Sequence, residues 1–293
     1  MRSQRYLRDE LRFLTEFGAL FDVIEQGAVS QSRRLEERLA GSTPLSDVLE
    51  RDFFPLLPPS AARHPLVRGA GRGGRLLVVV TSDEGLVGSL HTAVIREALA
   101  RADERTRWVF IGQRGVRLLG TRVANAHAMS IPSEEEAERS VRRVSQFVLT
   151  QYLREGLQDA WLISPRFVSM TRQEVVARPL LPLPVDGRLA PSEIEGMQDM
   201  VIEPSAARVV EALGAQWVEA VCRDSFWSSR RAEFAARTLH IESSRQELAK
   251  QTKAAQYAFF KTMHERVDVM VRETCVVQRH VVQRKAAQAR AAR

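Results

Sequence analysis

Apolar residues recur at every seventh position through residues 204–293. This spacing predicts a long helix that packs against a partner along one seam. No proline follows Pro204, and Gly214 is the only later glycine, so nothing in this stretch would end a helix. At about 1.5 Å per residue, such a helix would extend on the order of 120 Å, several times the diameter of a small domain.

The seam of this predicted helix has two registers. The first consists of Ala206, Leu213, Ala220, Trp227, Phe234, Ile241, Leu248 and Ala255, and the second of Phe260, Met263, Val267, Met270, Thr274, Val277 and Val281. The companion positions of the first register include Asp224, Arg231 and Arg245, so the middle of the seam is half polar. We expect the register to change near Gln256.

The first forty residues repeat the same spacing. Their apolar positions are Leu7, Leu14, Phe21, Ala28 and Leu35. Gly41 and Pro44 then provide the turn chemistry that ends a helix. We therefore expect residues 1–40 and residues 204–293 to pair antiparallel as a coiled coil, with the far end of the longer helix left for another binding partner.

Residues 75–185 show a different pattern, in which short apolar strands alternate with helical segments. The sequence predicts strands at residues 76–80, 108–111 and 160–163, a helix from Ser89, and a helical stretch at residues 133–152. This alternation is typical of a Rossmann-like α/β domain with a largely parallel sheet. The predicted fold is thus α/β: an antiparallel coiled coil of long terminal helices with this domain inserted. Residues 41–74 and 186–203 are expected to be linkers.

Composition narrows the possible classes. Hydrophobic residues make up 44% of the 293, enough for a packed core, and no apolar run approaches the roughly 18 residues that cross a bilayer. The N-terminal sequence MRSQRYLRDELRF lacks the pattern of a signal peptide. Cys222 and Cys275 are far apart and have no histidine at ligand spacing, so we expect no disulfide, no metal site and no cofactor.

The net charge of +7 would suit a nucleic acid, an acidic protein or an anionic membrane face, although arginines scattered along helices also suit solvated surfaces. The C-terminal tail contains Arg279, Arg284, Lys285, Arg290 and Arg293. It contains no aromatic residue that could stack on bases. A coiled-coil nucleic-acid-binding protein with an α/β head stays open as an alternative, and salt-dependent retention on DNA would support it.

The turn TSDEGLVGSL follows the first predicted strand, at the edge where α/β proteins often bind ligands. Its candidate residues are Thr81, Ser82, Asp83, Gly85, Leu86 and Gly88. The turn lacks both GxxxxGK[ST] and GxGxxG spacing, which argues against a phosphate loop and favours a tight turn capped by Ser82 or Asp83. A nucleotide-using α/β enzyme is the remaining alternative, and it would require stabilisation by ATP or NAD.

Several segments in register resemble the gamma (central stalk) subunit of F-type ATP synthases. VVVTSDEGLVGSLHTAVI is similar to the family's TSD-x-GL turn, and WVFIGQRGVRLL is similar to its strand and glycine turn. LQDAWLISPRFVSMTRQEVVARPLLPLP resembles its closing strands, and VIEPSAARVVEALGAQWVEA resembles the opening of its long C-terminal helix. The resemblance covers nearly the whole chain, and the motifs are specific only together.

The resemblance implies a rotating shaft without an active site of its own. Such a shaft couples transmembrane proton or sodium flow to ATP synthesis or hydrolysis. Its implied partners are the catalytic and non-catalytic subunits of the hexamer, an epsilon-type stalk subunit and the membrane c-ring, with no nucleic acid. Its implied location is the cytoplasmic face of the plasma membrane, as a peripheral protein.

The family's catch motif, near the end of the long helix, falls by position on Arg266, Arg272 and Glu273. The resemblance makes these residues candidate contacts to a loop of a catalytic subunit. The family's basic N-terminal signature is replaced by ALFDVIEQGA, which contains Asp22 and Glu25. This departure favours a divergent branch, such as the alternative sodium- or proton-pumping F-type ATPase of prokaryotes.

Overall fold

The computed structural model describes residues 4–39, 44–119, 126–185 and 202–291. They form two compact units, each assembled from separate parts of the chain. The smaller unit contains Met1–Glu25 and Ile241–Arg293, and the larger contains Gln26–His240. Two long helices, α1 (Gln4–Leu39) and α7 (Ala206–Ala291), contribute residues to both units. Both predicted terminal helices are therefore present, each uninterrupted.

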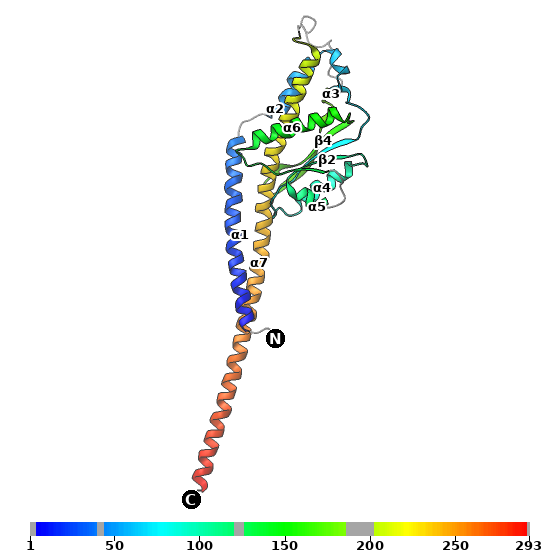
Figure 1. The fold of residues 1–293 in the computed structure, drawn as a ribbon. Helices are drawn as coiled ribbons and strands as arrows, with labels where there is room; N and C mark the ends of the chain where they lie inside the picture. The colour runs from blue at the N-terminus through cyan, green and yellow to red at the C-terminus, as the bar shows by residue number, and fades with distance from the viewer. Residues whose placement is uncertain (1–3, 40–43, 120–125, 186–201, 292–293) are drawn as a thin grey trace. The chain divides into compact units, whose positions relative to one another are not determined.

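A five-stranded sheet forms the centre of the larger unit (Figure 1). Its strands are β1 (Arg75–Val80), β2 (Arg107–Ile111), β3 (Ala126–Met129), β4 (Asp159–Ser169) and β5 (Arg172–Leu181). They lie in the order β3-β2-β1-β4-β5, with β1 to β4 parallel and β5 antiparallel to β4. The predicted α/β class with a largely parallel sheet is confirmed.

Side chains of β1 alternate between two hydrophobic layers because successive residues of a strand point to opposite faces. Val78 and Val80 share a core with α6 (Ala137–Arg154) and α7. Leu77 and Val79 share another with α4 (Leu90–Arg101) and Leu119 of α5 (Gln113–Leu119). Burial on both faces explains why β1 reads as a continuous apolar run and not as an alternating strand.

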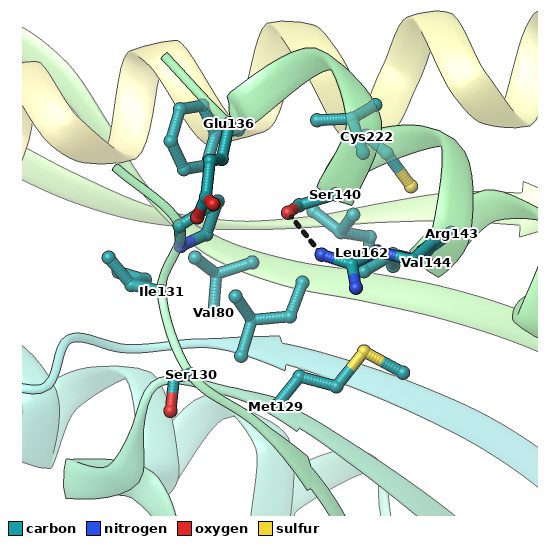
Figure 2. Close-up of a pocket in the computed structure, with 14 residues that line it drawn as sticks. Val80, Met129, Ser130, Ile131, Glu136, Ser140, Arg143, Val144, Leu162 and Cys222 are labelled. Atoms are coloured by element: carbon teal, nitrogen blue, oxygen red, sulfur yellow. Dashed lines mark hydrogen bonds between the residues drawn. The ribbon is translucent and has the colours of Figure 1, made fainter. Parts of the chain in front are cut away.

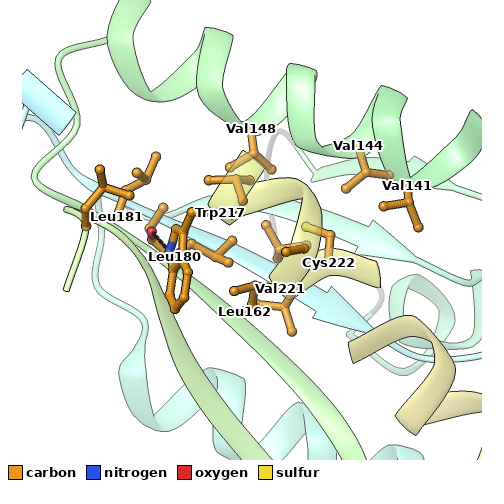
Figure 3. Close-up of a cluster of buried hydrophobic side chains, with 14 of the residues drawn as sticks. Val141, Val144, Val148, Leu162, Leu180, Leu181, Trp217, Val221 and Cys222 are labelled. Atoms are coloured by element: carbon orange, nitrogen blue, oxygen red, sulfur yellow. Dashed lines mark hydrogen bonds between the residues drawn. The ribbon is translucent and has the colours of Figure 1, made fainter. Parts of the chain in front are cut away.

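Trp217 anchors α7 in the core of the larger unit. Its ring is 1% exposed, lies 5.3 Å from the ring of Phe54, and donates from Nε1 to the carbonyl oxygen of Leu180 at 3.0 Å. Figure 3 shows valines of α6 directed toward the same cluster from the opposite helix. In this part of the chain, α7 serves as a layer of the α/β domain.

The expected linker at residues 41–74 is corrected by the structure. It contains α2 (Leu45–Val48), η1 (Leu49–Phe53), η2 (Phe54–Leu56), η3 (Pro59–Arg63) and α3 (Pro65–Arg68). Leu49, Phe54, Leu57, Ala61 and Leu66 are buried in the core beside α7. The prolines of this segment allow only brief helical turns, so its apolar residues follow no regular spacing. The segment nevertheless contributes apolar side chains to the core.

Two further boundaries differ from the sequence-based expectation. The helix expected from Ser133 begins at Ala137, and the N-cap residue Glu136 makes no side-chain capping bond. The sequence did not indicate α5 or β3, which are only seven and four residues long. The second expected linker, residues 186–203, lies outside the described residues except for its last two positions.

Candidate functional site

In the smaller unit, the predicted seam residues of α1 lie on one face. Leu7, Leu14 and Phe21 are 2%, 8% and 7% exposed, and Ile241 of α7 is fully buried. Leu248 and Met263 are half-buried. A Cβ placed on Gly18 would lie 3.5 Å from Leu248, so the two helices approach closely there. In Figure 1, the start of α1 lies beside α7.

Polar contacts between α1 and α7 show that the helices of the smaller unit run antiparallel. Arg266 donates to Oε1 of Gln4 at 2.6 Å. Arg245 donates to Oε2 of Glu25 at 2.5 Å and lies 3.4 Å from Oδ1 of Asp22. As the residue number rises along α1, it falls along α7. Asp22 and Glu25, the acidic departures from the family signature, therefore have a cationic partner within the chain.

The remaining seam residues belong to the larger unit. Leu35 is fully buried, Trp227 is 6% and Phe234 is 1% exposed, and all three are part of the main core. Leu213 is partly buried and packs against that core. Along this part of α7, the seven-residue repeat marks contacts with the α/β domain as well as with α1.

The first candidate catch residue, Arg266, makes the contact of α7 with Gln4 of α1, and Arg272 and Glu273 lie beyond it. All three side chains are exposed. Met270 and Val277 are 67% and 61% exposed, so neither packs against the described part of α1. Met263, near the start of the second predicted register, is half-buried, whereas the residues of this register beyond the Arg266–Gln4 contact are exposed.

The polar side chains of the turn after β1 form hydrogen bonds within the turn and to the segments that follow β2 and β3. The hydroxyl oxygen of Thr81 lies 3.1 Å from the carbonyl oxygen of Ile111 and accepts the backbone N–H of Gly115 at 3.0 Å. The Ser82 hydroxyl donates to the carbonyl oxygen of Glu84 at 2.7 Å. The Asp83 carboxylate accepts the N–H groups of Gln113 and Ile131 at 2.7 and 3.0 Å.

These bonds assign the polar side chains of the turn a structural role. A phosphate loop needs free donors directed at the ligand, whereas these donors and acceptors join the ends of β1, β2 and β3. Gly88 and Leu86 take positive φ angles of 58° and 64°, and a Cβ on Gly85 would lie 2.7 Å from the Arg114 guanidinium. The expected cap by Asp83 is thus a link between neighbouring loops.

The turn also contacts α7 through a buried ionic cluster, which the sequence did not indicate. Arg237 donates to Oε1 of Glu233 at 2.6 Å, and both side chains are less than a tenth exposed. Arg237 also reaches Glu84 at 2.9 Å and the carbonyl oxygen of Gly85 at 3.4 Å. Arg230 donates to the other oxygen of Glu233 at 2.8 Å. Within this cluster, Arg237 is the residue that links the turn to α7, and Glu233 positions it.

His91 lies against this cluster. It is 7% exposed, and its Nε2 is 2.8 Å from the Ser82 hydroxyl. Burial lowers the pKa of His91, the charge of Glu233 acts in the opposite sense, and those of Arg114 and Arg237 lower it further. Among the described residues, no group of three or more His, Cys, Asp or Glu side chains could hold a metal ion, and no helix could cross a membrane.

Two solved structures of ATP synthase contain a chain with this fold. One chain of the Euglena gracilis mitochondrial ATP synthase OSCP/F1/c-ring structure matches with a TM-score of 0.68 at 14% identity, over 94% of this chain and 93% of that chain. A chain of the Euglena gracilis mitochondrial ATP synthase rotor structure matches with a TM-score of 0.62 at 12% identity, over 90% of this chain and 98% of that chain. The fold is thus one found in ATP synthase subunits.

The sequence comparisons then give the family. The family model described as ATP synthase matches residues 7–263. The ATP synthase gamma chain of Polaromonas naphthalenivorans is 27% identical over 254 residues, which cover 83% of this chain and 87% of that protein. The gamma chain of Nitrosospira multiformis is 26% identical over 258 residues with the same coverage. The chain belongs to the ATP synthase gamma family.

Proposed function

We propose that this chain is the central rotating shaft of an F-type ATP synthase or ATPase, and that it couples ion flow to ATP synthesis or hydrolysis. One observation carries the proposal. The 86-residue helix α7 is a layer of the α/β core in its first part, whereas its side chains at residues 266–282 are exposed. A helix with this distribution of burial is suited to contact other subunits along its free part.

The proposed partners are the catalytic and non-catalytic subunits of the hexamer, an epsilon-type stalk subunit and the c-ring. The exposed apolar residues near the end of α7 are Val267, Val269, Met270, Val271, Val276, Val277, Val281 and Val282. Surrounding subunits would cover them, because isolated proteins seldom expose a continuous apolar face. Arg272 and Glu273, which lie among these apolar residues along α7, would add polar contacts to a catalytic subunit.

The buried cluster around Glu233 gives the proposed shaft a mechanical connection to its α/β domain. The buried pair of Glu233 and Arg237 lies within α7 and positions the Arg237 guanidinium, which reaches Glu84 and the carbonyl oxygen of Gly85 in the turn. The cluster is supplemented by Ser229, whose hydroxyl donates to the carbonyl oxygen of Pro165 at 3.2 Å. Force on α7 would therefore reach the sheet through β4 and through the turn after β1.

The chain is part of the membrane-associated ATP synthase complex, and we further propose that it lies on the cytoplasmic face of the plasma membrane. The proposed contact with the c-ring would hold the chain at the membrane surface, and the cytoplasmic side is the one that the family resemblance implies. The alternative of a nucleic-acid-binding protein is not supported by the comparisons, since the matches given above are with ATP synthase chains.

Affinity purification from membranes tests the proposal. A tag on the α/β domain should recover the catalytic hexamer and the c-ring together with this chain. The double substitution Arg272→Ala and Glu273→Ala should leave the complex intact but lower its ATPase activity, whereas Arg5→Ala on the exposed side of α1 serves as the matched control. Recovery of the chain without any hexamer subunit would contradict the proposal.

A further inference from the structure

A cavity of about 430 Å³ lies at the carboxyl ends of the parallel strands. Its walls include Val80 at the end of β1, Ile111 at the end of β2 and Met129 at the end of β3. Well-packed protein cores contain few voids much larger than a water molecule. Small-molecule pockets have volumes of roughly 300–1,000 Å³, so this cavity is in the range of a ligand site.

The position of the cavity in the sheet is also one where ligands bind. The strand order places β2 on one side of β1 and β4 on the other, so the chain connections diverge at β1. In open α/β sheets, the crevice outside the carboxyl ends at such a point accommodates ligands. Leu162 of β4 and Val80 of β1 line the cavity on either side of this point.

The chemistry of the lining is divided between two sides. The inner wall is apolar and consists of Val80, Ile111, Val141, Val144, Leu162, Cys222 and Phe226, each at most 9% exposed. Of the polar residues, Ser130 and Glu136 lie between β3 and α6, and Ser140 and Arg143 lie in the first two turns of α6. In Figure 2, Ser140 and Arg143 are joined by a hydrogen bond, which measures 3.0 Å.

The walls are held apart by interactions outside the cavity. Arg223 of α7 donates to Glu138 of α6 at 2.9 Å, and Arg142 of α6 lies 3.8 Å from Glu219 of α7. The loop after β3, which forms another wall, is fixed by the hydrogen bond that the Ile131 N–H donates to Asp83. Because these contacts involve the backbone of the described loop and paired charges, the cavity is formed before any ligand arrives.

We infer that this cavity binds a small, neutral and largely apolar molecule, of the size of two or three rings. The charges of Glu136 and Arg143, the two ionisable side chains among the polar lining residues, cancel. Ligand selection would therefore depend on apolar volume, with a single polar group of the ligand near Ser140 and Arg143. The buried Cys222 thiol has a pKa raised to about 12 by desolvation, so it adds no charge to the inner wall.

The neutral fluorophore N-phenyl-1-naphthylamine is a suitable probe of the full-length chain. Its fluorescence should rise saturably with one site per chain. Val144→Phe and Ile131→Trp fill the cavity from two walls, and each should weaken binding at least about tenfold, while melting temperatures confirm that both variants fold. Val277→Glu, on the exposed end of α7, is the matched control for adsorption and should leave binding unchanged.

Methyl NMR of the methionines tests the site without any cavity variant. The probe should shift the resonance of Met129, which lines the cavity, and leave that of Met270, which is exposed on α7. An unsaturable signal, an unshifted Met129 resonance, or equal weakening by Val277→Glu and Val144→Phe would overturn the inference.

Discussion

The two parts of α7 have the same secondary structure but different surroundings. In the larger unit, apolar residues on most sides of the helix are buried, for example Val210, Trp217, Val221 and Phe226. In the smaller unit, the buried residues of α7 are Ile241 and Ala255, and residues 266–282, beyond the start of α1 at Gln4, are exposed. The comparison shows that α7 stays helical whether or not its side chains are buried, and we expect the stability of each part to follow its burial.

The largest effect is expected in the core of the larger unit. Trp217→Ala removes a ring packed against Phe54 and leaves the Leu180 carbonyl without its donor. We expect a loss of about 3–5 kcal/mol in the free energy of unfolding, measured by urea denaturation. Tyr257→Ala is the control because that ring is 76% exposed, and its midpoint should not change. If Trp217→Ala and Tyr257→Ala lowered the free energy of unfolding equally, the proposed difference between the buried and the exposed part of α7 would be wrong.

The ionic cluster between the turn and α7 should give the next largest effect. Glu233→Ala leaves Arg230 and Arg237 without their shared carboxylate, and we expect a loss of about 3 kcal/mol in the free energy of unfolding. Glu242→Ala, nine residues further along α7 and solvent-exposed, should be nearly neutral. If thermal and urea unfolding of the Glu233 variant match those of the parent, the cluster does not hold the turn.

Much of the architecture could be predicted from the sequence because periodicity reports burial directly. The heptads of α1 and α7 and the apolar run of β1 are long or strongly patterned. The cluster of Glu233 and Arg237 could not be predicted, since charges four residues apart usually indicate an exposed helix face. Their burial results from the turn packing onto that face, which is a contact over 150 residues of sequence.

The point at which α7 leaves α1 could not be located from the sequence. Met270 and Val277 continue the heptad spacing, but the contact of α7 with Gln4 of α1 is at Arg266. The packing of residues 45–68 was missed because proline-rich segments have no periodicity to read. Both features depend on long-range contacts that local patterns do not encode.

The seam of the smaller unit should be less sensitive than the core. Phe21→Ala removes a ring that is 7% exposed, and we expect a loss of about 2 kcal/mol there. Hydrogen exchange should show faster opening of residues 241–262 of α7, with no change in β1. Phe13→Ala, at a 61% exposed position of the same helix, is the matched control. Unchanged exchange in the Phe21 variant would mean that α1 does not protect α7.

Acidification should destabilise the larger unit through His91. Its folded-state pKa lies below the unfolded value, so the unfolded chain binds the proton first, and stability present above the unfolded pKa is lost as the pH falls toward the folded pKa. Denaturation midpoints at pH 7.5 and 5.5 measure this fall. His91→Gln should reduce the slope, and a steeper slope in this variant would contradict the sign.

The smallest effect is expected at Arg245. Its ion pairs with Glu25 and Asp22 are solvent-accessible, so Arg245→Ala should cause only a slight decrease in the melting temperature of the smaller unit at low salt. The decrease should disappear at about 0.5 M salt, where exposed charges are screened. A large, salt-independent decrease would show that the pair matters through packing instead.

The rotor assignment is tested most directly by watching the chain turn. A bead can be attached to a cysteine introduced at the exposed Arg139 of α6, in a Cys275→Ser background, with the hexamer fixed to a surface. The assignment predicts rotation in one direction that requires ATP and proceeds in three steps per turn. A bead that stays still while the same complexes hydrolyse ATP at the full rate would contradict it.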